Sequence, residues 1–159
     1  MIYQRHILFF LLVMLCAVIQ TTLTVLLPPS FQPDLLLALV ILAGLYMLPA
    51  VGSVYAVGIG YLQDLLTLSI VGLFMLGRVI IYILGNRLSH EFYAKSAPAQ
   101  FIVIFLLGIV DAVLIFALSA IFGQEAHFKW YMLWRIPIRA LTTALFGVPL
   151  FFIIKKIWE

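Results

Sequence analysis

Residues 98–122 read PAQFIVIFLLGIVDAVLIFALSAIF, and Asp111 is the only charged residue among them. A helix of about 20 mostly apolar residues is long enough to cross the hydrocarbon core of a bilayer, which is roughly 30 Å thick. Pro98 lies at the start of the stretch, where a helix tolerates proline. The stretch therefore predicts a transmembrane helix.

The rest of the chain has the same apolar character. Of its 159 residues, 66% are hydrophobic and 9% are charged, whereas soluble domains are about half apolar and about a quarter charged. The length fits one transmembrane helical domain, residues 1–159, and no loop is long enough to fold separately. A soluble catalytic domain is therefore not expected. The net charge of +3 is small and dispersed, which indicates membrane topology rather than nucleic-acid binding.

Proline-, glycine- and polar-rich breaks divide the chain into six segments. They are residues 7–27, 34–48, 51–66, 71–88, 98–122 and 133–157. The second and third segments have only about 15 residues, or roughly 23 Å of helix, so they form either a thin helical pair or a re-entrant hairpin. The expected fold is an all-α integral membrane protein, a compact bundle of about six transmembrane helices.

The basic residues predict the topology. Arg5 precedes the first segment, Arg87 and Lys95 lie between the fourth and fifth, and Lys155 and Lys156 end the chain. Because cytoplasmic loops are enriched in Lys and Arg, six crossings with both termini in the cytoplasm are expected.

The loop before the sixth segment disagrees with this assignment, since it carries Lys129 and is followed by Arg135. Aromatic residues at both ends of that segment fit the belt that Trp and Tyr form at membrane interfaces. They are Trp130, Tyr131, Trp134 and Trp158.

Four ionisable positions in the apolar segments matter most, since charge at membrane depth is costly and often functional. Asp34 follows Pro33 at a helix start and is expected to cap it. Asp64 ends the third segment, where the helix dipole disfavours a carboxylate, so it should accept from the following loop or pair with a cation. Arg78 and Asp111 lie at similar depths, roughly 12 and 16 Å from the same side, and are expected to pair.

Arg135 and Arg139 are four residues apart and therefore share one helix face. They are expected to anchor at lipid headgroups, or to reach Asp64 or a partner protein. His6, His90 and His127 are far apart in the chain, without metal-ligand spacing.

Small residues at a spacing of four mark a packing stripe in the third segment. Gly52, Ala56 and Gly60 allow a neighbouring helix backbone to approach closely. Gly72 and Pro149 are also expected to be helix-packing residues. Pro149 lies inside the sixth segment and is expected to kink it, with Thr142 or Thr143 satisfying the freed carbonyl. The single cysteine, Cys16, is expected to be a buried packing residue.

Catalytic motifs are absent from the sequence. There is no His-Glu-x-x-His, glycine-rich phosphate loop or Gly-x-Ser-x-Gly elbow. Membrane aspartyl signal peptidases carry asparagine near each catalytic aspartate, whereas the only asparagine here is Asn86. We therefore expect a protein that is not an enzyme and has no cofactor.

Several short motifs, in their order and spacing, resemble the rod shape-determining protein MreD family. They are Pro33-Asp34 opening a leucine-rich helix, Gly60-x-x-x-Asp64, Gly72, Asp111 and the tail Gly147-Val148-Pro149 before Lys155-Lys156. The family favours Ser-Gly after the second aspartate, where this chain has Thr67-Leu68-Ser69.

This resemblance implies a scaffold subunit of the bacterial cell-elongation machinery in the cytoplasmic membrane. Its expected partners are MreC and, through it, the MreB cytoskeleton, RodA and a penicillin-binding transpeptidase. It also implies a fold like the substrate-binding subunit of energy-coupling-factor transporters, with a possible cavity open to the outside. A small-molecule binding subunit of a transporter is the alternative.

Overall fold

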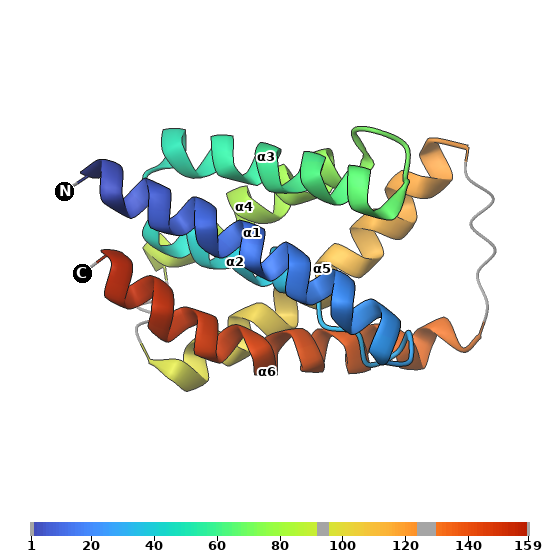
Figure 1. The fold of residues 1–159 in the computed structure, drawn as a ribbon. Helices are drawn as coiled ribbons and strands as arrows, with labels where there is room; N and C mark the ends of the chain where they lie inside the picture. The colour runs from blue at the N-terminus through green and yellow to red at the C-terminus, as the bar shows by residue number, and fades with distance from the viewer. Residues whose placement is uncertain (1, 92–95, 124–129, 159) are drawn as a thin grey trace.

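The computed structural model describes residues 2–91, 96–123 and 130–158, and all regular structure within them is helical (Figure 1). Three helices are long and apolar enough to cross a membrane: α1 (Ile2–Leu26), α5 (Ala97–Ile121) and α6 (Met132–Trp158). Three shorter helices complete the described fold: α2 (Leu35–Tyr46), α3 (Pro49–Thr67) and α4 (Leu73–Glu91).

All six predicted segments are helices, but their bounds differ from the prediction, most clearly in the first three. The first helix begins at Ile2 instead of Ile7. The third helix has 19 residues and is therefore roughly 28 Å long, close to the thickness of a hydrocarbon core. Helix α2 has 12 residues, roughly 18 Å of helix, and is too short to cross such a core.

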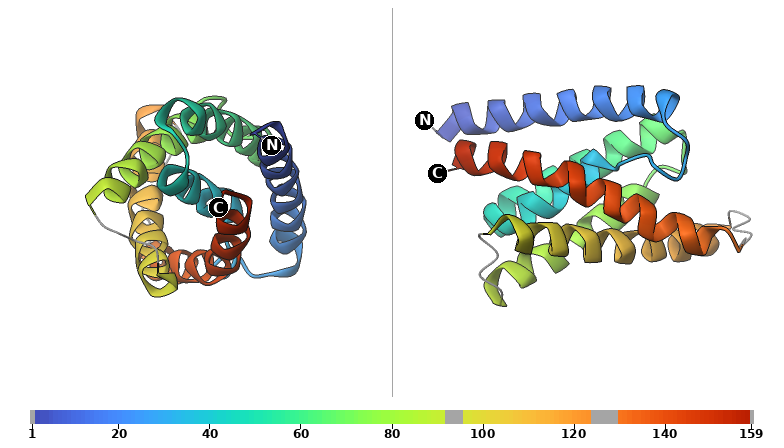
Figure 2. Two further views of the ribbon diagram at one scale, coloured as in Figure 1. Left: turned by 90° about the vertical axis from the view of Figure 1, so that its left-hand side faces the viewer. Right: turned by 90° about the horizontal axis from the view of Figure 1, so that it is seen from below.

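Helix α2 is the centre of the bundle. It contacts each of the other five helices, and the end-on view of Figure 2 shows it surrounded by them. Every residue from Leu35 to Gly44 is buried. A helix that is apolar on all sides is stable only where protein or lipid covers every face, and here protein covers them.

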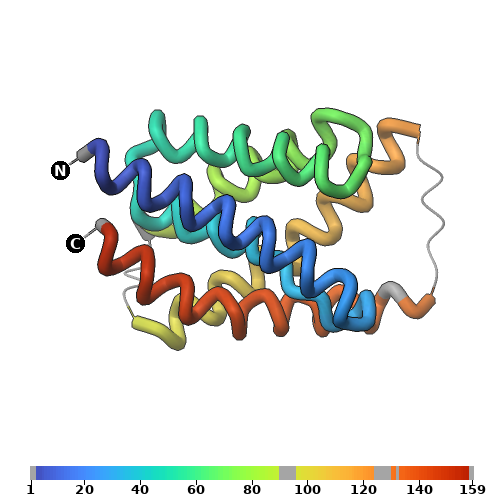
Figure 3. The backbone as a smooth tube through the Cα atoms, in the orientation of Figure 1, coloured from blue at the N-terminus to red at the C-terminus, as the bar shows by residue number. Residues whose placement is uncertain are grey.

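The chain between α1 and α2 turns back into the bundle, which explains why α2 is short (Figures 2 and 3). Irregular backbone at this depth requires hydrogen-bond partners from the protein. Gln32 Nε2 donates to the carbonyls of Thr24 and Leu27, and Gln20 Oε1 accepts from the Leu36 N–H at 3.1 Å. Side-chain amides thus replace the missing helical hydrogen bonds.

The predicted small-residue stripe packs α3 against α4. A Cβ on Gly52 would overlap the Tyr82 ring, and one on Gly60 would lie about 2.5 Å from Met75 Cα. Ala56, between the two glycines, is fully buried. The stripe therefore does permit the close backbone approach that the sequence predicted.

Gly72 and Pro149 do not have the packing role that was expected of them. A Cβ on Gly72 would meet no atom within 4 Å, but its φ of +106° is a conformation that other residues rarely adopt. Gly72 is therefore required by the turn before α4. Pro149 is exposed, and α6 continues through it. Both Thr142 and Thr143 donate to the Arg139 carbonyl, not to the one that Pro149 frees.

Both chain termini lie at one end of the bundle, together with the C-terminal end of α4 and the start of α5 (Figure 1). Arg5, Arg87, Lys155 and Lys156 belong to these helix ends. Trp130, Tyr131 and Trp134 are exposed at the opposite end. Lys95, Lys129 and His127 lie outside the described residues.

Candidate functional site

Asp34 lies where the returning loop meets α2, and it caps that helix. Its Oδ1 accepts from the Leu37 N–H at 2.9 Å, and its own N–H donates to Thr143 Oγ1 at 2.9 Å. The side chain is 4% exposed. The N-cap that Pro33-Asp34 predicted is present, and it also fixes α2 to α6.

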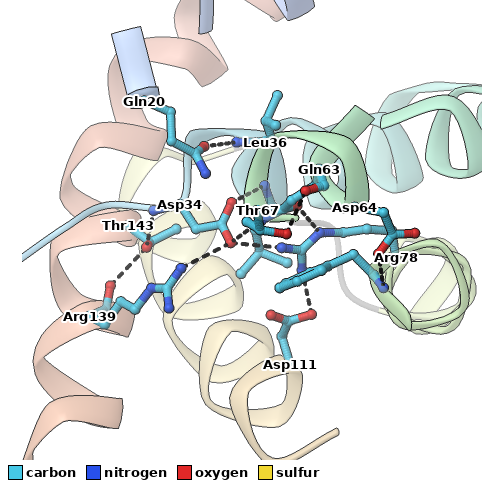
Figure 4. A network of polar contacts seen from close by, with 12 residues as sticks. Gln20, Asp34, Leu36, Gln63, Asp64, Thr67, Arg78, Asp111, Arg139 and Thr143 are labelled. Carbon is cyan, nitrogen blue, oxygen red and sulfur yellow. Dashed lines mark hydrogen bonds and ion pairs between the residues drawn. The ribbon is translucent and has the colours of Figure 1, made fainter. Parts of the chain in front are cut away.

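Arg78 of α4 is fully buried and joins two carboxylates (Figure 4). Its Nη1 donates to Asp111 Oδ1 at 2.5 Å, and its Nη2 donates to Asp34 Oδ2 at 2.7 Å. The predicted Arg78–Asp111 ion pair is therefore present. The second carboxylate was missed, because the sequence showed Asp34 only as a helix cap. The Phe74 ring lies 5.5 Å from the guanidinium carbon, a distance typical of a cation–π contact.

Gln63 of α3 completes this group and was not predicted. Its Oε1 accepts from Arg78 Nε at 2.9 Å, and its Nε2 donates to Asp34 Oδ2 at 3.0 Å. All three guanidinium nitrogens of Arg78 therefore have acceptors. A polar residue within the apolar run before Asp64 was the available signal. We call Asp34, Gln63, Arg78 and Asp111 the polar network; it connects α2, α3, α4 and α5.

Asp64 is next to Gln63 in the chain but binds different groups. Its carboxylate accepts from the N–H groups of Gly72 and Phe74, each at 2.8 Å, and from that of Met75 at 3.4 Å. These groups form the turn before α4 and the first residues of that helix, where free N–H groups attract an anion. As predicted, Asp64 accepts from the segment that follows it.

Arg139 reaches Asp34, not Asp64 as the sequence had allowed. Its Nη2 lies 3.6 Å from Asp34 Oδ2, and its side chain is 49% exposed. Arg135, one turn earlier, lies over the Tyr131 ring at 5.4 Å. The two arginines therefore share a face of α6, as predicted, and that face borders the polar network.

A cavity of about 360 Å³ separates the two arginines from α5. Its polar wall includes Asp34, Asp111, Ser119, Arg135, Arg139 and Thr143. Its apolar wall includes Leu37, Phe74, Ile115, Phe116 and Ile136. The cavity thus combines charged groups with a larger apolar surface, as small-molecule sites commonly do.

Within residues 2–91, 96–123 and 130–158, no three His, Cys, Asp or Glu side chains are grouped so as to hold a metal ion. The one histidine side chain with a described contact, His6, lies 3.1 Å from the Tyr55 hydroxyl. The single cysteine, Cys16, is buried as predicted. Ion pairs and helix caps occupy the carboxylates of Asp34, Asp64 and Asp111.

Comparison of the chain with protein-family models, curated proteins and solved structures found no match.

Proposed function

We propose that this chain is a non-enzymatic scaffold subunit of the bacterial cell-elongation machinery, related to the MreD family, and that it binds MreC. Through MreC it would act with the MreB cytoskeleton, RodA and a penicillin-binding transpeptidase. The proposal starts from the ordered motifs in the sequence and therefore rests on analogy to a family.

The observation that supports this proposal is the set of contacts that the motif residues make in the fold. Asp34 and Asp111 hold Arg78 in the centre of the bundle, and Asp64 and Gly72 form the turn into α4. These residues stabilise one particular arrangement of helices. An arrangement held in this way gives a scaffold a fixed outer surface for a partner to bind. The outer helix faces would then be the surfaces that meet lipid and the partner.

We place the protein in the bacterial cytoplasmic membrane with six crossings and both termini in the cytoplasm. The shared end of the two termini supports an even number of crossings (Figure 1). The basic residues at that end support its cytoplasmic position. The short α2 would complete its crossing together with the returning loop of residues 28–33, and its five neighbours would seal it from lipid.

Depletion in the rod-shaped bacterium that carries this gene tests the proposal. Depleted cells should become round, and a tagged copy should co-purify with MreC. The matched control is a complementing copy with the partly exposed Ser53 changed to Ala, which should restore rods. Persistent rods, together with no recovery of MreC, would reject the proposed function.

The cavity favours a second candidate, a small-molecule binding subunit of a transporter. A volume of about 360 Å³ with a polar and an apolar wall lies within the size range of sites for small ligands. A water-soluble vitamin retained through purification, together with an ATPase pair encoded beside the gene, would support this function. Neighbouring genes for murein elongation would instead support the scaffold.

A further inference from the structure

The cavity follows one face of α5 for much of that helix. Its α5 residues are Gly108, Asp111, Ala112, Ile115, Phe116 and Ser119. These positions repeat at spacings of three and four and extend over roughly 16 Å of helix axis. At the Gly108 end, a Cβ would lie only 3.2 Å from Ala140 Cβ, so α5 and α6 pack closely there. The cavity therefore extends along α5 from this contact.

The charged groups at the cavity do not balance. Arg135 and Arg139 line the cavity together with Asp34 and Asp111. Arg78 lies beside the cavity with both carboxylates as partners, so three arginines accompany two carboxylates. Arg78 has strong bonds to both carboxylates. One positive charge on α6 is then uncompensated within the described part of the cavity.

Arg139 has donors available for a ligand. Its contact with Asp34 Oδ2 is 3.6 Å long, and that oxygen already accepts shorter bonds from Gln63 and Arg78. Arg135 contacts an aromatic ring, and no described carboxylate lies within ion-pair distance of it. Two guanidinium groups one helical turn apart can bind the same phosphate, since each presents a planar fork of N–H donors.

The surroundings of the arginines indicate the rest of the ligand. Ile115, Phe116 and Ile136 give the cavity an apolar wall. Trp130 and Trp134, exposed at 77% and 72%, lie within a few residues of Arg135. Exposed tryptophans at the end of an apolar helix are typical of the level of lipid headgroups. A ligand with an anionic head and an apolar body fits both walls at this depth.

We propose that the cavity binds a phosphorylated amphiphile, with its phosphate at Arg135 and Arg139 and its apolar part along α5. This site does not depend on the proposed scaffold function. Arg78 remains tied to Asp34 and Asp111 and keeps the cavity wall in place. A phospholipid or a polyprenyl phosphate has this chemistry.

Native mass spectrometry of the detergent-purified protein tests the proposal. The probes are phosphatidylglycerol, zwitterionic phosphatidylcholine of matched chains, and inorganic phosphate. The wild-type protein should retain one phosphatidylglycerol at least about tenfold more strongly than phosphatidylcholine. Both lipids carry a phosphate, but the choline cation of phosphatidylcholine is repelled by the two arginines and offsets the charge of its phosphate, and effects of this size are typical of charge-assisted contacts. Inorganic phosphate should bind more weakly than the lipid.

Three variants distinguish lipid binding in the cavity from non-specific electrostatic attraction to the protein surface. R135Q/R139Q should lose the preference for phosphatidylglycerol. A112F, which keeps every charge but fills the space beside α5, should lose it as well. The matched control R87Q removes an exposed arginine at the other end of the bundle and should keep it.

Thermal unfolding in detergent shows whether each variant is folded, and R135K/R139K supplies a second test that keeps the charge. The proposed site would be overturned if folded R135Q/R139Q kept the preference for phosphatidylglycerol, or if R87Q lost that preference to the same extent. Inorganic phosphate binding as tightly as the lipid would overturn the apolar part of the ligand.

Discussion

Two arginines approach the same carboxylate oxygen, Asp34 Oδ2, from different sides of the molecule (Figure 4). Arg78 is 2.7 Å away and fully buried, whereas Arg139 is 3.6 Å away with 49% of its side chain exposed. The region around Arg78 is closed, since each of its nitrogens has an acceptor from the protein. The region around Arg139 is open to the cavity. An arginine beside this carboxylate can thus stabilise the fold where it is buried, or remain available to a ligand where it is partly exposed.

The difference follows from the cost of burying charge. An ion taken out of water is stable only if nearby opposite charges and hydrogen bonds replace its hydration. Arg78 receives two carboxylates and an amide, and this requirement fixes the positions of α2, α3 and α5 relative to α4. Arg139 keeps part of its hydration, so its position is much less restricted.

Removing Arg78 should have the largest effect. R78A leaves two buried carboxylates without their main partner and should lower the free energy of unfolding by about 3–5 kcal/mol. Thermal unfolding of the purified protein in detergent measures the change. D111N should cost less, since Arg78 keeps Asp34 as a partner.

A double-mutant cycle checks that the effect arises from the ion pair. R78A/D111A should be more stable than R78A alone, because it leaves one unpaired carboxylate instead of two. Additive losses from Arg78 and Asp111 would show that the two side chains contribute independently.

Removing the Asp64 carboxylate should have the next largest effect. D64A leaves three N–H groups at the start of α4 without their acceptor, and it should cost about 2–3 kcal/mol. Hydrogen exchange should increase at Gly72, Phe74 and Met75 while α2 stays protected. Unchanged exchange at these three amides would contradict the capping role.

Packing around the closed region can be tested at two glycines of α3. In G60A the new Cβ meets the Met75 backbone, and moving a backbone aside costs about 1–3 kcal/mol, partly offset by alanine's better helix propensity. The matched control is G58A, where a Cβ meets nothing within 4 Å. The control should be as stable as the wild type or slightly more stable. Equal unfolding midpoints for the two variants would contradict the close packing.

Local rules predicted much of the fold and part of the site. Apolar runs and proline breaks gave six helices, and the Pro33-Asp34 pair gave the α2 cap. The depths of Arg78 and Asp111, counted along their helices, were enough to predict that they pair. Each of these inferences needed only the helical rise and the cost of an unpaired charge.

The missed contacts depend on how the helices rotate and where a loop runs. The return of residues 28–33 into the bundle brings Asp34 to Arg78 and Arg139, and no local pattern specifies such a return. Gln63 joins the polar network because α3 faces α4 along its glycine stripe. Gly72 was assigned to packing because spacing alone does not distinguish a close contact from a positive φ.

Removing Arg139 should have the smallest effect on stability and therefore tests the comparison most directly. R139Q loses a long contact to a carboxylate that Arg78 already neutralises, and partly exposed pairs contribute at most about 1 kcal/mol. The unfolding midpoint of R139Q in detergent should stay within a few degrees of that of the wild type. R78Q has the same change of side chain, and its unfolding midpoint should lie far below those of the wild type and R139Q. A loss in R139Q as large as in R78Q would mean that the open region also holds the fold. If R139Q instead keeps its stability, Arg139 is free to change partners, which a site for an anionic headgroup requires.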